Sequence, residues 1–413
     1  MRKITLFLAF LLVAGIGFSQ TKKNQNEASI KLLNSSDSKS VISFSFEDFE
    51  INEVEIPKAV MHKLSLGDAT PILLEAAPEV LKLTASVVIP DKAEMTVKVV
   101  DSKYVDYPNV SLLPSKGNLT RDIDPATVPY SFGKAYQQDE FFPAKLTQLR
   151  EPFILRDYRG QTVVVYPFQY NPVKKLLRVY HEMVVEISKK SDNGQNILVR
   201  NKSVERVSSE FNQLYTNQFL NYNQQKYTPV VDEGRMLIIS YGSYMANMQD
   251  FIDWKIQAGM EVDIVNVSTI GNSAAIKTYV ENYYVSPGLT FLLLVGDHAQ
   301  VPSYSASAGM SDNTYGYITG SDHYPEVFVG RFSAENTNHV ATMVDRSVDY
   351  EKYPTINDFY AKNIGIASSQ GPGDDNEMDY EHVRNMQTDL LAYNYSSCSE
   401  LFDGSQGGLD AVG

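Results

Sequence analysis

The spacing of apolar residues changes once along this chain, and that change constrains the fold more than any single motif does. From about residue 31 to 187, apolar residues alternate with polar ones or form short β-branched runs, punctuated by Pro and Gly. Such alternation, without an amphipathic helix, predicts an antiparallel β-sandwich. The clearest predicted strands lie at 41–46, 83–89, 95–100, 162–166 and 183–187.

After residue 226 the pattern becomes one of strands alternating with helices. Buried-strand runs are predicted at 236–240, 262–267, 290–295, 327–332 and 363–367, and helices at 244–257, 274–284, 336–353 and 380–393. Strands that are apolar on both faces and alternate with helices predict a mostly parallel sheet covered by helices. Ligands of such sheets bind beyond the carboxyl ends of the strands, which directs attention to segments 296–311 and 368–379.

The predicted organisation divides the 413 residues into four parts. A chain of this length exceeds one ordinary domain of roughly 100–200 residues. Residues 1–19 read as a signal peptide, 20–187 as the β-sandwich, 188–226 as a linker, and 227–413 as the α/β part. The linker is rich in Asn and Gln, and we expect it to be an exposed connector.

The amino terminus predicts export. Arg2 and Lys3 precede an apolar run at 4–16, and small residues follow at Gly17 and Ser19. A membrane anchor is the alternative, but the run is shorter than the roughly 20 residues that a span requires, and we predict no transmembrane segment.

Charge and cysteine content exclude several classes of protein. Lys+Arg 36 against Asp+Glu 50 gives a net charge of −14, the wrong sign for coating nucleic acid or an anionic membrane. Cationic partners and divalent metals are more natural. One Cys excludes a disulfide framework and thiolate clusters, and six scattered His argue against zinc.

Two acidic segments are candidate sites. Asp297 follows a predicted central strand, and Asp322, Tyr324 and Glu326 lie in the loop before the next strand. We expect these carboxylates to lie on loops at one sheet edge, interleaved with carbonyl oxygens, an arrangement that suits Ca²⁺, although the same residues could cap turns or face solvent. The second segment, 371–382, either begins a helix and faces solvent or offers one carboxylate to a cationic substrate.

The sequence gives little support for a catalytic nucleophile within these residues or for a nucleotide-binding site. Cys398 has no nameable activating neighbour and reads as a small buried hydrophobe. The sequence contains no GxGxxG, GxxxxGK[ST] or GxSxG.

Several long motifs resemble the gingipain-type cysteine peptidases, in particular the Arg-cleaving ones. They are LVGDH (294–298), SDNTYGYITGSDHYPEVFVGRFS (311–333), YTPV with GRMLII (227–239), FIDWKIQAGMEV (251–262), PSKGNLTR (114–121), FFPAKL (141–146), FILRDYRGQ (153–161) and QYNPVKKLLRVY (169–180). The resemblance implies a caspase-like α/β peptidase domain made as a zymogen behind a β-sandwich prodomain. It also implies an exported bacterial protein, secreted or at the cell surface, that cleaves protein substrates after Arg or possibly Lys.

The resemblance assigns roles to particular residues. Maturation would cut between Lys226 and Tyr227, Arg121 of the prodomain would plug the S1 pocket as an inhibitor, and Asp379 would bind the substrate's basic side chain. Calcium ligands are implied at Asp297, Thr319, Asp322, Tyr324 and Glu326, with a second site at Glu377 and His382.

Two departures from the family leave a second interpretation open. The family's third catalytic residue is a Glu, and Gln370 stands there. The catalytic His and Cys match no residue up to Gly413, so we expect them further along a longer precursor, and this fragment alone to be inactive. The alternative is a non-catalytic surface or binding protein built on a peptidase-like domain.

Overall fold

The computed structural model describes residues 27–406 except 58, 68, 121–122, 201–203, 225–228, 308, 355–357, 373–376 and 405. Three predictions therefore lie outside the described residues: the signal peptide at 1–19, the inhibitory Arg121, and the cleavage site at Lys226 and Tyr227. No helix of the described part is both long enough and apolar enough to cross a bilayer.

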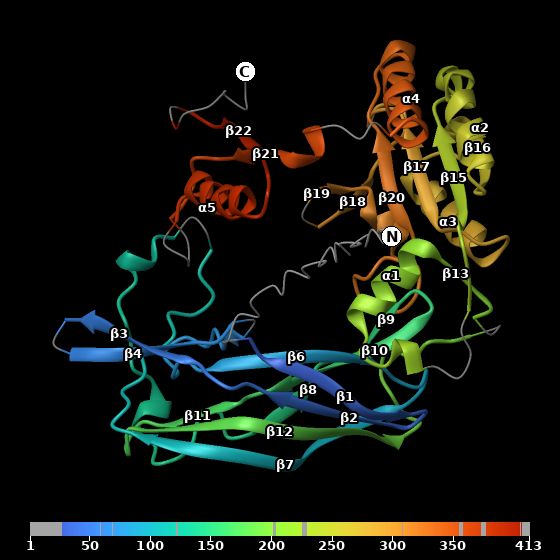
Figure 1. The fold of residues 1–413 in the computed structure, drawn as a ribbon. Coiled ribbons are helices and arrows are strands. Elements are labelled where there is room, and N and C mark those ends of the chain that lie inside the picture. Colours follow the sequence, from blue (N-terminus) through green and yellow to red (C-terminus); the bar gives the residue numbers. More distant parts are fainter. Residues whose placement is uncertain are drawn as a thin grey trace, which may run out of the picture.

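The first part of the chain is the predicted antiparallel sandwich of two sheets (Figure 1). One sheet has the order β1-β2-β12-β11, with β7 also paired to β12; the other has the order β5-β6-β10-β8, with β9 also paired to β10. A hairpin of β3 and β4 extends from it. The strands are β1 (Ser29–Ser36), β2 (Lys39–Ser45), β3 (Glu50–Ile56), β4 (Ala59–Ser65), β5 (Thr70–Pro71), β6 (Leu81–Val88), β7 (Glu94–Pro108), β8 (Thr147–Leu149), β9 (Phe153–Leu155), β10 (Tyr158–Val165), β11 (Phe168–Asn171) and β12 (Leu176–Ser191).

The core of the sandwich forms where the apolar positions of the two sheets face each other. Ile42 and Phe44 of β2 and Val185 of β12 pack with Val163 and Val165 of β10, all of them buried. These are alternate positions of their strands, as a sheet with one face toward a core requires. Strand β12 continues to Ser191, so the sandwich extends past the predicted boundary at 187.

The prediction that 188–226 is an exposed connector is wrong. The segment contains β13 (Arg206–Ser208), which pairs with β14 (Val230–Asp232), helix α1 (Ser209–Gln218), and the 3-10 turn η3 (Tyr222–Gln224). Phe211, Tyr215, Phe219 and Tyr222 are buried and pack on the β9–β10 hairpin. The prediction relied on the Asn and Gln content of the segment and overlooked these four aromatic residues. Their spacings of three and four residues match the helical repeat.

The α/β part contains the predicted parallel sheet, in the order β16-β15-β17-β20. Helices α2 and α4 cover one face and α3 the other (Figure 1). The bounds are β15 (Arg235–Ser240), α2 (Gln249–Gln257), β16 (Glu261–Asn266), α3 (Ser273–Val285), β17 (Phe291–Val295), β20 (Phe328–Phe332) and α4 (Thr337–Lys352). A short hairpin of β18 (Tyr304–Ala306) and β19 (Gly309–Ser311) follows β17.

A second, smaller α/β unit follows α4. Strand β21 (Lys362–Ala367) pairs in parallel with β22 (Ser397–Phe402), and α5 (Asp379–Ala392) connects them. The strand–helix alternation thus continues as predicted, but this pair forms a sheet separate from the four-stranded one.

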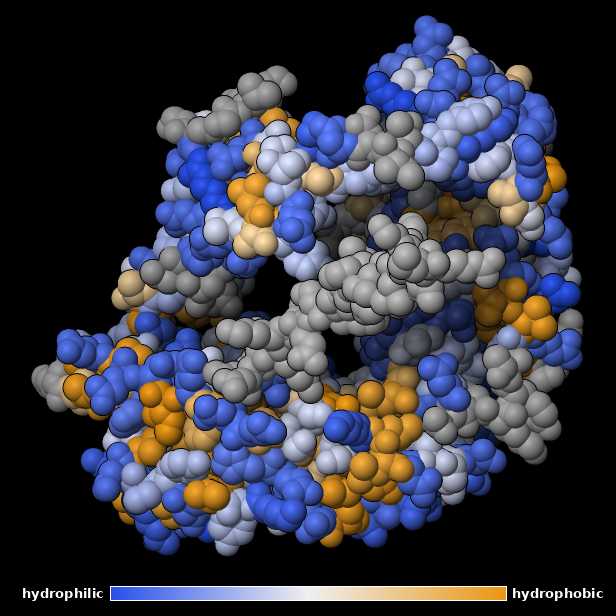
Figure 2. All heavy atoms as spheres, viewed as in Figure 1, coloured by the Kyte–Doolittle hydropathy of each residue, from blue (hydrophilic) through white to orange (hydrophobic). Residues whose placement is uncertain are grey.

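Apolar residues are unevenly distributed over the surface. In Figure 2, apolar residues gather over the strands in the lower part of the view, whereas hydrophilic residues cover most of the helices above. Exposed apolar side chains of the sandwich include Leu33 of β1 and Val100 of β7.

Candidate active site and metal-binding residues

The turn after β21 meets the first residue of α5 and forms the candidate substrate site. Ser368 Oγ donates a hydrogen bond to Asp379 Oδ2 at 2.5 Å, and the Asp379 amide donates to the Gln370 carbonyl oxygen at 2.8 Å. The Gln370 amide in turn donates to Ser368 Oγ at 3.1 Å. The structure therefore brings together Asp379 and Gln370, which the sequence separates by nine residues.

Asp379 lies at the start of a helix. Its carboxylate lies in the first turn of α5, where the helix dipole favours negative charge, and the residue is half-buried. A carboxylate can accept hydrogen bonds from two N–H groups of one guanidinium. The amide of Gln370 carries no charge, so it cannot act as the charged partner of a histidinium.

Glu377 and His382, predicted as a second metal site, are neighbours. His382 Nδ1 lies 2.9 Å from Glu377 Oε2, and Asn385 Nδ2 donates to Glu377 Oε1 at 2.8 Å. The His382 side chain is about half exposed. The two residues form a polar pair at the amino-terminal end of α5.

Glu326 is the most unusual carboxyl group of the α/β part, because it is fully buried. Its Oε2 accepts hydrogen bonds from the amides of Ile318 at 2.7 Å and Thr319 at 2.9 Å. Its Oε1 has no hydrogen-bond partner among the described residues. Burial raises the pKa of Glu326 to about 7, although those two amides act in the opposite direction.

Asp322 lies in the same loop, and groups of the sandwich hold it. Asp322 Oδ2 accepts hydrogen bonds from the Ile154 amide at 2.8 Å and from Asn196 Nδ2 at 2.7 Å. Its Oδ1 accepts one from the Tyr324 amide at 3.0 Å. The charge of Asp322 also contributes to the raised pKa of Glu326.

The prediction that Asp297 shares one sheet edge with Asp322 and Glu326 is wrong. Strands β17 and β20 are parallel, with Phe291 opposite Phe328. Asp297 follows the carboxyl end of β17, whereas Asp322 and Glu326 precede the amino end of β20. The two groups therefore lie at opposite edges, and the five-residue strands separate them by roughly 15 Å at about 3.3 Å per residue. The sequence held the signal, because one acidic group follows a strand and the other precedes one.

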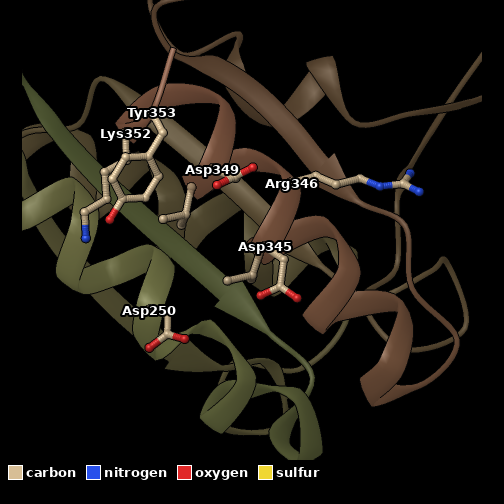
Figure 3. A pocket seen from close by; sticks show the side chains of 8 residues that line it. Asp250, Asp345, Arg346, Asp349, Lys352 and Tyr353 are labelled. Carbon is tan, nitrogen blue, oxygen red and sulfur yellow. The ribbon is translucent and has the colours of Figure 1, made fainter. Parts of the chain in front are cut away.

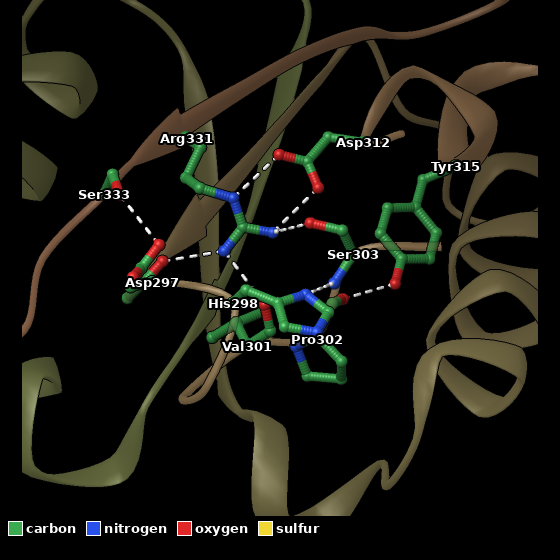
Figure 4. Close-up of polar contacts among 10 residues, drawn as sticks. Asp297, His298, Val301, Pro302, Ser303, Asp312, Tyr315, Arg331 and Ser333 are labelled. Atoms are coloured by element: carbon green, nitrogen blue, oxygen red, sulfur yellow. Dashed lines mark hydrogen bonds and ion pairs between the residues drawn. The ribbon is translucent and has the colours of Figure 1, made fainter. Parts of the chain in front are cut away.

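Asp297 instead accepts a hydrogen bond from Ser333 Oγ at 3.1 Å and lies beside an arginine-centred network that sequence reasoning missed (Figure 4). The amide of His298 and the hydroxyl of Ser333 hold the pKa of Asp297 below its usual range. Arg331, at the end of β20, donates from Nη1 to the carbonyl oxygens of Gly296 at 2.7 Å and Val301 at 2.9 Å.

The same guanidinium pairs with Asp312. Arg331 Nε and Nη2 donate to the two carboxylate oxygens of Asp312 at 2.7 and 2.8 Å, and Nη2 also donates to Ser303 Oγ at 3.1 Å. The Arg331 side chain is 12% exposed. This bidentate pair holds the pKa of Asp312 below its ordinary value. Arg331 thus fixes the loop after β17.

The residues present fit a cation only in part. Among the described residues, no three His, Cys, Asp or Glu side chains are grouped as metal ligands. Calcium, however, accepts carbonyl and water oxygens together with few carboxylates, and the unpartnered Oε1 of Glu326 is a candidate ligand. The donor set of this loop would be Glu326 and Asp322 with the backbone oxygens of Thr319 and Tyr324. Asp297 is not part of it.

A pocket of about 400 Å³ opens between α2 and α4 (Figure 3). Its lining is mostly charged and includes Asp250, Asp345, Arg346, Asp349 and Lys352. None of the predicted site residues lines it. Cys398, predicted to be a small buried hydrophobe, is only partly buried, with Sγ 3.8 Å from the Gln387 carbonyl oxygen.

Comparison with known proteins assigns both parts of the chain. The family model Propeptide_C25 matches residues 19–227, and the model Peptidase family C25 matches residues 231–403. The chain therefore belongs to a class of peptidases in which a propeptide precedes the peptidase domain. It is a member of peptidase family C25, the gingipain-type cysteine peptidases, which confirms the resemblance seen in the sequence.

Curated relatives agree with this assignment. Gingipain R1 of Porphyromonas gingivalis is 36% identical over 411 residues, which cover 97% of this chain and 41% of the relative. Gingipain R2 of the same species is 35% identical over 414 residues, with 97% and 56% covered. Lys-gingipain HG66 is 25% identical over 85% of this chain and 21% of its own length. The chain thus spans about half or less of these relatives.

Two solved structures are also similar. The complex of the pro- and mature domains of RgpB from Porphyromonas gingivalis is 34% identical, with a TM-score of 0.44, covering 48% of this chain and 97% of that one. The Arg-specific cysteine proteinase gingipain R is 35% identical, with a TM-score of 0.39, covering 43% and 44%. At these TM-scores the family assignment rests on the sequence.

Proposed function

We propose that this chain is the propeptide and the first part of the peptidase domain of an exported zymogen, whose mature enzyme cleaves proteins after Arg. The observation that carries the proposal is Asp379, a half-buried carboxylate held by Ser368 at the start of α5, in a chain that matches the gingipain R proteins over 97% of its length. A guanidinium is the natural ligand of such a carboxylate.

The chemistry would be acyl transfer through a cysteine thiolate. In this proposal the thiolate attacks the scissile carbonyl, a His acts as general acid and base, and backbone N–H groups hold the oxyanion. In this proposal Asp379 would supply the S1 carboxylate. Arg121 would occupy the S1 pocket in the zymogen, and cleavage between Lys226 and Tyr227 would precede its release.

We further propose that calcium stabilises the loop before β20. Glu326 and Asp322 would bind the ion together with the carbonyl oxygens of Thr319 and Tyr324, and Glu377 with His382 would form a second, separate site. A divalent cation would neutralise the buried Glu326 carboxylate and satisfy its free oxygen. The ion's role here is structural.

The test of the proposed substrate class is Asp379→Asn in the complete precursor. Mature enzyme should lose at least about 100-fold in kcat/KM on peptides with P1 Arg, because the guanidinium then lacks its ionic partner. Hydrolysis of P1 Arg, P1 Lys and P1 norleucine peptides is compared by steady-state kinetics.

Asp389→Asn is the matched control, since Asp389 is exposed near the other end of the same helix. If Asp379→Asn keeps the Arg preference of the unaltered enzyme, Asp379 is not the S1 carboxylate.

Gln370 favours a second candidate, a non-catalytic binding protein on the same fold. Its backbone carbonyl oxygen accepts a hydrogen bond from the Asp379 amide, and the family resemblance places a catalytic Glu at this position. In that case purified precursor would bind Arg-containing peptides without cleaving them, even after the chain is cut at 226–227.

A further inference from the structure

A pocket of about 230 Å³ lies on the outer face of the propeptide sheet β5-β6-β10-β8. Its polar lining and its floor come from three neighbouring strands: Lys82 of β6, Gln148 of β8 with Arg150 just after it, and Val164 of β10 with Tyr166 just after it. The side chains of Val163 and Val165 pack into the core of the sandwich, so strand alternation turns Val164 and Tyr166 to the opposite face. None of the residues that line this pocket belongs to a site described above.

The pocket carries two positive charges and no negative one. Lys82 and Arg150 line it, and none of the other lining residues is an acid. Burial and the nearby Arg150 guanidinium both lower the pKa of Lys82, and no carboxylate of the described residues acts in the opposite direction. In a chain with a net charge of −14, two adjacent cations without an acidic partner in the described structure are unusual. An anion bound between them would relieve their repulsion.

The Tyr166 hydroxyl adds a third donor. Tyr166 is 8% exposed, and its oxygen accepts a hydrogen bond from Gln148 Nε2 at 2.6 Å. A phenol also has one hydrogen to donate, and no acceptor for that hydrogen exists in the part of the chain that the structure describes. Burial raises the pKa of Tyr166 while Arg150 lowers it, so the guanidinium lies near the hydroxyl. An acceptor oxygen in the pocket would satisfy this buried donor.

The remaining lining is apolar. Val164 is almost fully buried and lies among the three donors, while Leu73 and Leu74 follow β5 and are exposed. Exposed leucines beside a charged pocket offer contact to the carbon atoms of a ligand. The pocket is therefore suited to an anion that carries an organic group, and less to a bare inorganic ion.

We propose that this pocket binds a phosphate monoester, with the phosphate between Lys82 and Arg150 and the organic group against Leu73 and Leu74. A phosphate monoester carries up to two negative charges above about pH 6, which matches the two cations. The fork of a guanidinium can bind two phosphate oxygens, and an ammonium group acts as a point charge. The third oxygen would accept the Tyr166 hydrogen. A carboxylate has one charge and two oxygens, so it would leave one cation and one donor unmatched.

Titration calorimetry of the whole chain with phenyl phosphate at pH 8 and low salt tests the proposal. The Kd should lie below about 1 mM. Inorganic phosphate should bind at least about threefold more weakly because it lacks the apolar group. Benzoate should bind at least about tenfold more weakly because it carries one charge. Absence of phenyl phosphate binding at about 5 mM overturns the proposal, and an equal Kd for benzoate overturns the assigned ligand class.

Two substitutions locate the binding. Arg150→Gln should raise the Kd for phenyl phosphate at least about tenfold, since it removes a charge and a bidentate donor. Tyr166→Phe keeps the buried ring and removes only the hydroxyl, so it should raise the Kd about 3- to 10-fold. Arg150 is exposed, and its replacement should leave the Tm of the chain unchanged. An unchanged Kd for Arg150→Gln overturns the proposal.

The matched control is Arg178→Gln. Arg178 lies on the same sandwich but outside the pocket, and it pairs with both carboxylate oxygens of Asp106 at 2.8 and 2.9 Å. This control should leave the Kd for phenyl phosphate unchanged. Equal losses in the Arg150 and Arg178 variants would mean that the ester responds to overall charge, which also overturns the proposal. The titration needs no catalysis, so its outcome is independent of the proposed peptidase function.

Discussion

At the scale of single residues, two buried arginines organise the loops of this chain. Arg331 satisfies two carbonyl groups and one carboxylate after β17, and Arg159 donates to four backbone carbonyl oxygens, two of the sandwich and two of the segment after β12. A planar guanidinium with five donors can bind several loops at once, which a lysine cannot do. Neither residue has a sequence signature, because each acts through carbonyl groups that are distant in the chain.

Asp312→Asn tests the Arg331 network. Removing one partner of this largely buried pair should destabilise the α/β part by about 3 kcal/mol at pH 7. The Asp312 pKa is lowered in the folded state, so its contribution is present above the unfolded value of about 4 and is lost as pH falls through the folded pKa. Urea unfolding at pH 7 and pH 3 measures the free energy of unfolding of variant and parent. The difference between the two free energies should be smaller at pH 3 than at pH 7.

Asp139→Asn is the comparison, because Asp139 is an exposed carboxylate that is also hydrogen-bonded, to Asn171 and Lys174. It should change stability by no more than about 0.5 kcal/mol. A constant difference between the Asp312 variant and the parent across this pH range would show that the charge of Asp312 does not matter.

At the scale of elements, helix α1 is the clearest case of tertiary context deciding a role. Its sequence is polar overall, yet Phe211 and Tyr215 are buried between the sandwich and the parallel sheet. The Tyr215 hydroxyl donates to Asp157 Oδ2 at 2.7 Å. The segment 188–226, which its composition marked as a domain boundary, therefore packs against both parts of the chain and connects them.

Phe211→Ala should destabilise the whole chain by about 3–5 kcal/mol, because it removes a large buried ring and leaves a cavity. Leu214→Ala on the same helix is the control, since Leu214 is 40% exposed and its loss should cost well under half as much. Thermal unfolding followed by circular dichroism measures both. Equal shifts in Tm would mean that α1 is not packed as described.

At the scale of the whole molecule, the loop from 317 to 326 is where the propeptide, the sheet and the proposed calcium site meet. In this loop Asp322 accepts hydrogen bonds from the Ile154 amide and Asn196 Nδ2, and Glu326 is fully buried. A substitution in this loop should therefore alter the stability of both parts of the chain.

Calcium should raise the Tm of the whole chain relative to a sample treated with a chelator. When the free calcium concentration is 100 times the Kd of the site, binding adds about 2.7 kcal/mol to the free energy of unfolding. Glu326→Gln should abolish the increase because it removes the buried carboxylate, whereas Glu335→Gln, at an exposed position, should keep it. A calcium-dependent increase that survives Glu326→Gln would place the ion elsewhere.

The sequence by itself determined the family, the antiparallel sandwich and the parallel sheet, because periodicity and long motifs are local properties of the chain. It also indicated Asp379, Asp322 and Glu326 as candidate site residues. Only the tertiary structure separated Asp297 from Asp322 and Glu326, because strand direction decides which edge of a sheet a loop occupies.

Tertiary structure likewise gave Arg156 its contacts and turned the 188–226 segment into a packed joint. These features depend on groups distant in the sequence meeting in space, such as Arg156 and Glu326, 170 residues apart, and Tyr215 and Asp157, 58 residues apart. No periodicity within either segment encodes such a meeting, since the burial and hydrogen bonds that fix it come from the other segment.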